Sequence, residues 1–305
     1  MTGLALQNVV VAGGSGLVGR HLVAALAAGG TRVTVLSRSP GAAALPAGVQ
    51  ARGWDDLPGA LAGADAVINL CGAGIADRRW SPARKQALLD SRVEPTRRLA
   101  QAMAEGGARV LVNASAVGIY GAMDGRPVLE SQAAGKGFLA RLCRQWEAAA
   151  DGAAAPGTRV VKLRLGVVLA QDGGALPKMA FPVRLCQGTR LGHGQQGLSW
   201  IHVDDLVRLF IEAAGNPAYT GPVNATSPMP VTNETFTRAL ARRLKRPMLP
   251  VPAFVTRAAL KVLLGEMGEA MLLEGAFVYP RVAEGRGFEF RFPGVEEALA
   301  DLVHV

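Results

Sequence analysis

The sequence has few cysteines, and their arrangement suits neither a disulfide framework nor a metal site. Three occur among 305 residues: Cys71, Cys143 and Cys186. None forms a Cys-x-x-Cys pair or lies near two histidines, a pattern that argues against a zinc site. We therefore expect no metal and a reducing compartment, the cytoplasm.

Long hydrophobic runs are also missing. The first residues lead almost directly into a strand, without the basic segment and cleavable apolar stretch of a secretory signal. The most apolar late segment, 252–264, is too short to span a bilayer and contains Arg257 and Lys261. We expect it to be a core helix with one solvent-exposed edge, and we expect no membrane partner.

Acidic residues are in deficit, with 24 against 33 lysines and arginines and a formal net charge of +9. The densest basic cluster, Arg242, Arg243, Lys245 and Arg246, falls at the end of a predicted helix, where cations suit the helix dipole. No aromatic stacking platform accompanies it. We interpret it as a solvated helix end, and nucleic acid as an unlikely partner.

Apolar strands that alternate with amphipathic helices are abundant. This order predicts an α/β fold with a Rossmann-type, doubly wound parallel sheet, because parallel strands need crossover connections. Glycine- and proline-rich punctuation after residue 171 predicts a smaller C-terminal α/β substrate domain. The Rossmann domain is expected over 1–170, completed by about 204–228, and the smaller domain over 171–203 and 229–305. The predicted strands are 9–12, 32–36, 66–70, 109–113 and 159–165; the predicted helices are 17–28, 82–103, 138–150 and 204–214, the last capped by an acidic residue.

A glycine-rich turn follows the first predicted strand and opens the first helix. It reads Gly13-Gly14-Ser15-Gly16-Leu17-Val18-Gly19. Such glycines allow a tight turn, close approach of the backbone to a pyrophosphate, and helix–strand packing. The helix N-terminus attracts the phosphates. We predict a dinucleotide site here.

The end of the second strand indicates which dinucleotide is bound. A site for NAD usually places Asp or Glu there to accept hydrogen bonds from the ribose hydroxyls. This chain has Ser37 and Arg38 instead, which can bind a 2′-phosphate. The sequence therefore predicts NADP(H) as the cofactor, the alternative being that Arg38 is an ordinary exposed arginine.

With these residues, the chain resembles extended short-chain dehydrogenase/reductases. More narrowly, it resembles an atypical NAD-dependent epimerase/dehydratase-like family that includes the YfcH and SulA-like proteins and carries a C-terminal domain. The resemblance covers nearly the whole chain. Its specific segments are 79–85, Ser91-Arg92-Val93-Glu94-Pro95-Thr96, 114–121, Trp146-Glu147, 199–205, 221–226, 244–247 and 287–290.

The resemblance implies further cofactor contacts. Segment 69–72 is expected to pass under the cofactor, Arg92 to reach its phosphate side, and the loop 166–168 to lie near the nicotinamide. For Arg92 the alternative is a surface arginine paired with Glu94 or Asp90. The resemblance thus adds six cofactor residues to the glycine turn, Ser37 and Arg38. They are Leu70, Cys71, Gly72, Arg92, Ser115 and Val168.

The proton-transfer pair of working short-chain dehydrogenases is missing. These enzymes use Tyr-x-x-x-Lys, in which the lysine lowers the pKa of the tyrosine. The corresponding helix here begins with Phe138 and Leu139 and has neither residue on the expected face. Ser115, at a strand end, and Lys85, which with Arg79 suits an anionic substrate, are the candidate catalytic substitutes.

Other candidates have plainer interpretations. We interpret Tyr120 as a residue that packs a turn. We interpret His193 as a loop histidine without a partner. His202 fits a strand–helix junction, and burial accounts for Trp80 and Trp200 as well as a ligand wall does.

Two functions stay open at this point. One is an NADP-dependent oxidoreductase or epimerase-like enzyme that acts on an unidentified small-molecule substrate. The other is a non-catalytic NADPH-binding regulator or sensor, which the SulA-like naming links to cell division. Assembly into a homodimer is left open.

Overall fold

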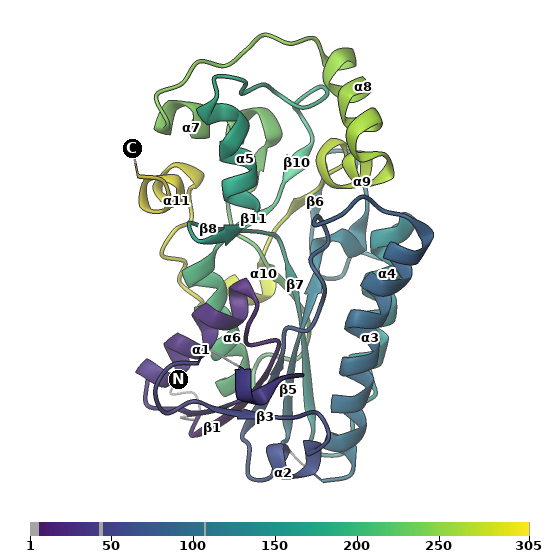
Figure 1. The fold of residues 1–305 in the computed structure, drawn as a ribbon, viewed down its shortest axis with the longest axis vertical. Helices are drawn as coiled ribbons and strands as arrows, with labels where there is room; N and C mark the ends of the chain where they lie inside the picture. Colours follow the sequence, from purple (N-terminus) through teal and green to yellow (C-terminus); the bar gives the residue numbers. More distant parts are fainter. Residues whose placement is uncertain (1–5, 43–44, 107, 305) are drawn as a thin grey trace.

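The computed structural model describes residues 6–42, 45–106 and 108–304. Its centre is a seven-stranded sheet of order β12-β7-β5-β4-β1-β2-β3, in which every neighbouring pair is parallel (Figure 1). The predicted Rossmann-type α/β fold is confirmed. The strands are β1 (Asn8–Ala12), β2 (Arg32–Leu36), β3 (Gln50–Arg52), β4 (Ala66–Asn69), β5 (Val110–Ala116), β7 (Arg159–Leu165) and β12 (Gly221–Ala225).

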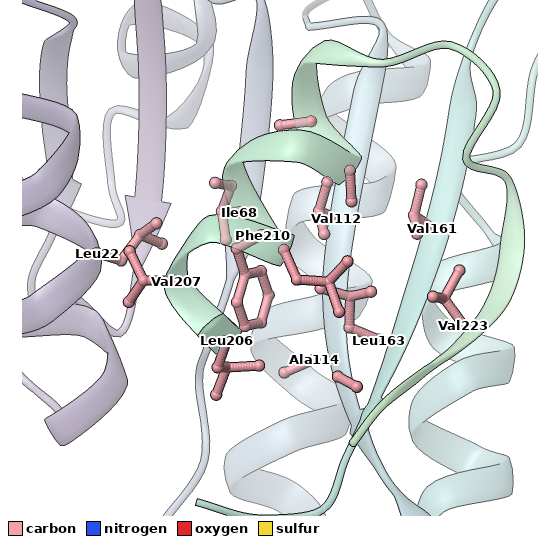
Figure 2. Packing of buried hydrophobic residues seen from close by; sticks show 14 of the residues in the cluster. Leu22, Ile68, Val112, Ala114, Val161, Leu163, Leu206, Val207, Phe210 and Val223 are labelled. Atoms are coloured by element: carbon pink, nitrogen blue, oxygen red, sulfur yellow. The ribbon is translucent and has the colours of Figure 1, made fainter. Parts of the chain in front are cut away.

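Helices cover both faces of this sheet. One face carries α1 (Leu17–Ala28) and α6 (Val203–Gly215), whose Leu22, Val207 and Phe210 pack on Ile68 and Val112 (Figure 2). The other face carries α2 (Leu57–Leu61), α3 (Pro82–Ala104) and α4 (Gly137–Asp151). Two apolar faces explain why the strands are nearly continuous hydrophobic runs.

A second region begins where β7 ends. Strand β8 (Val167–Ala170) follows after one residue and forms a small sheet with β9 (Gly173–Gly174) and β11 (Trp200–His202). Helices α5 (Ala175–Arg184), α7 (Asn233–Arg243) and α11 (Val295–Leu302) enclose a separate core around Trp200 and Phe236. This region therefore stands at the carboxyl edge of the main sheet, where ligands bind in open α/β folds.

Short elements complete the chain. They are η1 (Pro40–Ala42), η2 (Val117–Tyr120), β6 (Pro127–Val128), β10 (Gly197–Leu198), β13 (Val231–Thr232), α8 (Ala253–Leu264), α9 (Glu266–Gly268), the π-helix η3 (Glu269–Leu273), β14 (Phe277–Val278) and α10 (Arg281–Gly285).

The prediction of a core helix over 252–264 is wrong. A helix is present, α8, but Thr256 is its only buried residue. The inward line Thr256, Leu260 and Leu264 faces α9 and η3, while the side chains of Phe254 and Val262 are 74% and 72% exposed. Apolar composition predicted burial, but none of the elements in residues 6–42, 45–106 and 108–304 covers this helix from outside.

The predicted acidic cap at 204 is also wrong. Helix α6 is capped by His202, whose Nδ1 accepts a hydrogen bond from the Asp204 amide at 3.1 Å. The buried Asp205 instead accepts from the amides of Arg291 and Phe292, both at 2.9 Å. Asp205 therefore holds a distant loop rather than the helix start.

Candidate functional site

The glycine turn lies between β1 and α1 and is shaped for close backbone approach. Gly13 has φ +82°, and a Cβ atom there would lie 2.7 Å from the carbonyl carbon of Leu70. A Cβ on Gly19 would lie 2.3 Å from the carbonyl oxygen of Gly13. At Gly16 the nearest atom would be 3.4 Å away. Gly13 and Gly19 thus serve the packing of the turn, and Gly16 faces open space.

The amino end of α1 is free to bind an anion. Its N-cap, Gly16, makes no side-chain cap, and within the described ranges no group accepts from the amides of Leu17 or Val18. Unpartnered amides and the helix dipole together attract phosphate. The turn therefore fits the pyrophosphate of a dinucleotide on structural grounds.

Ser37 and Arg38 follow β2 at the same edge of the sheet. The Ser37 amide donates to the carbonyl of Arg52, and its hydroxyl accepts from the Ser39 amide at 3.1 Å. Arg38 is exposed, and no carboxylate pairs with it among the residues described. Burial raises the pKa of Cys71 to about 12, and the positive charge of Arg38 opposes this rise. A free cation here suits a 2′-phosphate.

Trp54 lies at this edge as well, and the sequence analysis did not find it. It follows β3, whose last residue pairs with the last residue of β2, and it packs against the same core as Cys71. The guanidinium of Arg98 lies 5.5 Å from its ring centre. Trp54 could have been found from its place just after a third strand. That strand, β3, has only three residues and no apolar run, so the sequence does not show it.

Asn69 fixes the backbone of 70–72. Its amide nitrogen donates to Thr96 Oγ1 at 2.7 Å and to Asn113 Oδ1 at 2.6 Å, and its amide oxygen accepts from the Cys71 amide. The buried Asn69 side-chain amide, hydrogen-bonded through both its nitrogen and its oxygen, holds the loop against α3 and β5. The path of Leu70, Cys71 and Gly72 beside Gly13 is therefore set before any ligand binds.

Arg92 lies under this loop. Its guanidinium donates to the carbonyls of Leu88 and Ala73, both at 3.0 Å, and lies 5.2 Å from the ring centre of Trp146. Burial lowers the pKa of Arg92.

The surface alternative for Arg92 is not what the structure shows, since Glu94 pairs with Arg97 and Asp90 accepts from Gln86. Contact of Arg92 with a cofactor phosphate stays a prediction.

Leu17 and Val168 come together at the hairpin of β8 and β9. A Cβ on Gly174 would lie 2.8 Å from Leu17 Cδ2 and 3.5 Å from the Val168 carbonyl oxygen. Val168 is thus close to the glycine turn and forms part of strand β8 rather than the predicted loop.

Ser115 belongs to a buried polar network. Its hydroxyl, on a residue 2% exposed, donates to Glu147 Oε1 at 2.7 Å. Glu147 accepts from Arg164 Nε at 2.8 Å and Nη2 at 2.9 Å. Arg164 also donates to the Tyr120 hydroxyl at 2.9 Å, and Tyr120 donates to Asn224 Oδ1 at 2.6 Å. The network joins the carboxyl ends of β5, β7 and β12.

This network sets the chemistry of Ser115 and Tyr120. Burial raises the pKa of Tyr120, and the charge of Arg164 opposes it only in part. Both hydroxyl protons are already donated within the network. Contact of Ser115 with a substrate stays a prediction, and it requires this hydroxyl to become accessible. The sequence analysis did not predict this network. Its signal is a charged residue inside an apolar pattern, as with Arg164 in β7 and Glu147 in α4.

Lys85 lies away from this network, on α3 next to α9. It lies in the first turns of α3, its ammonium donates to Glu266 of α9, and it lies 5.3 Å from the ring centre of Phe138. Trp80 packs edge-on against Phe138 at 4.9 Å. Lys85 therefore lies where the amino ends of α3 and α4 meet α9.

Arg79 reaches the same boundary. A Cβ on Gly265, next to Glu266, would lie 3.0 Å from its Nη2. The structure thus brings Lys85 and Arg79 together at the start of α9, while Ser115 contacts α4.

Helix α4 has apolar groups where a Tyr-x-x-x-Lys pair would lie. Phe138 lies between Trp80 and Lys85, and a Cβ on Gly118 would lie 3.2 Å from the Cβ of Leu139. Cys143, one turn later, is buried, and burial raises its pKa to about 12. None of these three side chains exchanges a proton near neutral pH.

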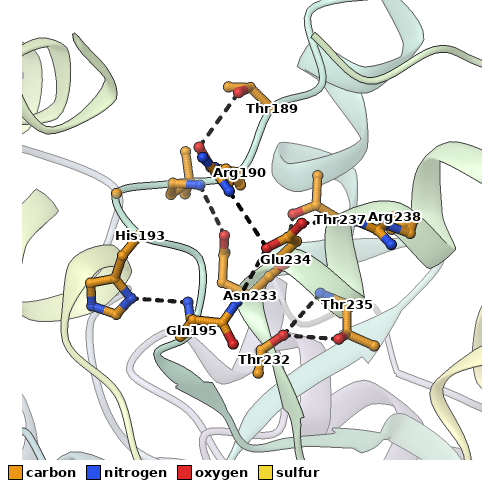
Figure 3. Close-up of polar contacts among 12 residues, drawn as sticks. Thr189, Arg190, His193, Gln195, Thr232, Asn233, Glu234, Thr235, Thr237 and Arg238 are labelled. Carbon is orange, nitrogen blue, oxygen red and sulfur yellow. Dashed lines mark hydrogen bonds and ion pairs between the residues drawn. The ribbon is translucent and has the colours of Figure 1, made fainter. Parts of the chain in front are cut away.

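Two of the four histidines, His193 and His202, were candidates from the sequence, and both have structural contacts. His193 Nδ1 accepts from the Gln195 amide at 3.0 Å, in a loop that Asn233 ties to α7 by accepting from the Leu191 amide (Figure 3). His202 is 1% exposed, stacks on Phe292 and pairs with Asp301. Within the described ranges no group of three or more His, Cys, Asp or Glu residues could hold a metal ion, and no described helix is long and apolar enough to cross a membrane.

Comparison with known proteins agrees with this geometry. The model of the NAD dependent epimerase/dehydratase family matches residues 9–225, and a domain of unknown function, DUF1731, matches residues 251–302. An epimerase family protein of Mycobacterium bovis is 44% identical over 297 residues, covering 95% of this chain and 96% of the relative.

Two further relatives are human SDR39U1 and a plant homologue of it. The chloroplastic SDR39U1 homologue of Arabidopsis thaliana is 41% identical over 304 residues, covering 96% of this chain and 86% of the relative. The crystal structure of human epimerase family protein SDR39U1, which contains NADPH, superposes with a TM-score of 0.88 at 33% identity and covers 97% of this chain and 99% of that one. The chain therefore belongs to the NAD dependent epimerase/dehydratase family.

Proposed function

We propose that this protein binds NADP(H) and acts as an oxidoreductase or epimerase on a small substrate without a Tyr-x-x-x-Lys pair. One observation carries the cofactor: Arg38, which has no carboxylate partner among the described residues, lies exposed just after the end of β2. The NADPH in the human relative supports the same choice. Ser37 and Arg38 would hold the 2′-phosphate, and the amino end of α1 the pyrophosphate.

When bound, the cofactor supplies a hydride donor or acceptor. The chain itself has to orient the substrate and move a proton. Lys85 is a partly buried cation at the candidate site, and we propose that it exchanges Glu266 for an anionic or carbonyl oxygen of the substrate. Ser115 would act through Glu147 by holding α4 in place, unless its hydroxyl is uncovered.

Calorimetric titration with NADPH and NADH tests the cofactor assignment. We expect NADPH to bind at least about tenfold more tightly, because a charge-assisted contact to the 2′-phosphate contributes about 1.5–3 kcal/mol. Equal affinities, or no binding of either, would overturn it. NADPH absorbance with a panel of carbonyl compounds and nucleotide sugars then tests for turnover.

A second function is favoured by α4. Phe138, Leu139 and Cys143 offer no proton at the usual position, which is the expected state of a cofactor-binding regulator. That function predicts NADPH binding without consumption and a protein partner retained only in the presence of NADPH. Turnover of NADPH with any compound of the panel would exclude it.

A further inference from the structure

Helix α8 exposes an apolar surface that no described part of the chain covers. The side chains of Phe254, Val262 and Leu263 are 74%, 72% and 69% exposed, and Val255 is 41% exposed. In Figure 1 the helix lies at the periphery of the molecule, at the end opposite the main sheet. Several large exposed apolar side chains on one helix mark an interaction site rather than ordinary surface.

The apolar side chains form one continuous arc. At 100° per residue, Phe254, Ala258 and Val262 lie along one line and Val255, Ala259 and Leu263 along the next. The buried Thr256 and the half-buried Leu260 and Leu264 lie on the opposite side. Half of the helix therefore faces solvent with apolar groups while the other half anchors it to α9 and η3.

Cations flank the arc, and carboxylates are missing. Arg257 and Lys261 lie beside the line of Phe254, and both are exposed. Neither has a carboxylate partner in the part of the chain that the structure describes. No Asp or Glu occurs from Thr235 to Gly265, a segment with seven cations: Arg238, Arg242, Arg243, Lys245, Arg246, Arg257 and Lys261.

The next carboxylates along the chain, Glu266 and Glu269, follow the C-terminal end of α8, and Glu266 is paired with Lys85. The segment that leads into α8 has the same character. Leu249 is 41% exposed, and the Arg246 guanidinium donates to the Cys186 sulfur at 3.9 Å. A helix with an apolar outer arc, flanking cations and no acidic residue has the composition of an interfacial helix.

We propose that α8 docks the protein on an anionic membrane surface, lying in the plane of the interface with Phe254, Val262 and Leu263 among the lipids. Arg257 and Lys261 lie at headgroup level. A second copy of the chain is a poorer occupant, because the same cations would face one another across a two-fold axis. This docking is independent of the proposed NADP(H) function.

Flotation with phosphatidylcholine vesicles, with and without phosphatidylglycerol, tests the proposal. We expect binding only to the anionic vesicles and weaker binding at high salt. The double variant Arg257→Gln/Lys261→Gln should weaken binding about 25-fold, at about fivefold per cation. The double variant Phe254→Gln/Val262→Gln should weaken it at least about tenfold through the loss of apolar area.

Matched variants keep the test specific. Arg32→Gln/Arg109→Gln removes two exposed cations at the amino edge of the sheet, and Leu129→Gln/Met229→Gln changes exposed apolar residues outside α8. Both should bind vesicles like the unmodified protein, and every variant should keep its unfolding transition and NADPH affinity.

Three results would overturn the proposal. The first is no flotation of the unmodified protein with anionic vesicles, and the second is equal losses in the control variants. The third is a dimer in analytical ultracentrifugation that the α8 variants dissociate while vesicle binding is unchanged, which would assign the surface to a second copy.

Discussion

Arg164 of β7 and Glu147 of α4 form a two-point ion pair inside the protein, at 2.8 and 2.9 Å, with both side chains 9% exposed. Burial opposes the charge on Arg164, but the hydrogen bonds and charges of Glu147 and Tyr120 outweigh it and raise its pKa. The pair fastens the helix that lacks Tyr-x-x-x-Lys to the end of the sheet. Ser115 and Tyr120 are both held by it.

Removing either partner should destabilise the protein strongly. Glu147→Ala leaves the Arg164 charge buried and unpaired, so we expect a loss of about 3–5 kcal/mol in urea unfolding. The double variant Glu147→Leu/Arg164→Met should be more stable than either single variant, since no lone charge remains. The surface pair Glu94–Arg97 is the control, where Arg97→Ala should cost less than about 1 kcal/mol. Equal costs at the two sites would contradict the assignment.

Gly16 and Gly13 should respond differently to alanine. Gly13→Ala forces a Cβ to 2.7 Å from Leu70 at φ +82°, so it should lower the free energy of unfolding by more than about 1 kcal/mol. Gly16→Ala meets nothing closer than 3.4 Å and should keep its stability. It should nevertheless weaken NADPH binding at least about tenfold, because the motif requires close backbone approach. Unchanged NADPH affinity in Gly16→Ala would show that the phosphates bind elsewhere.

Arg38 should carry the preference for NADPH. Arg38→Ala should weaken NADPH binding by about 10–100-fold, the equivalent of a charge-assisted hydrogen bond, and leave NADH binding within about threefold. The measurement is calorimetry with both cofactors. Arg32→Ala, at the other end of β2, is the matched control and should change neither affinity. A parallel loss of NADPH and NADH binding would mean that Arg38 serves the adenine rather than the phosphate.

Stability should fall at alkaline pH. Burial raises the pKa of the Cys143 thiol from 9.0 to about 12 and that of Tyr219 from 10.0 to about 12. The unfolded chain loses these protons first, so their contribution is complete below pH 9 and is lost as pH rises from 9 towards 12.

Each group adds a slope of up to about 1.4 kcal/mol per pH unit in this window. Urea unfolding at several pH values should show a shallower fall for Cys143→Ala. The same slope in both proteins would mean that Cys143 does not titrate on unfolding.

Substitutions of Lys85 and Glu266 should distinguish a catalytic role of this pair from a structural one. Their pair is partly exposed, so Lys85→Gln and Glu266→Gln should each change the free energy of unfolding by less than about 1 kcal/mol. With a substrate from the panel, Lys85→Gln should lower kcat about 100-fold or more if Lys85 handles the proton. Glu266→Gln frees the ammonium and should keep turnover. Equal losses in the two variants would make the pair structural.

Local patterns were enough for much of the fold. The helix predicted over 82–103 is α3, and Ser81 caps it by accepting from the Arg84 amide. The second strand and the glycine turn were found because an apolar run and a fixed glycine spacing are properties of adjacent residues. β3 was missed because three residues at a sheet edge, Gln50 to Arg52, have no apolar pattern.

By itself, the sequence determined the parallel sheet, the glycine turn and the place of Arg38 after the second strand. Each depends on residues close together in the chain, where spacing alone sets the backbone. Only the tertiary structure decided that Ser115 donates to Glu147, that Lys85 meets Glu266, and that α8 lies outside the core. Burial and pairing depend on which distant elements arrive next to a side chain, and neighbours along the sequence do not specify that.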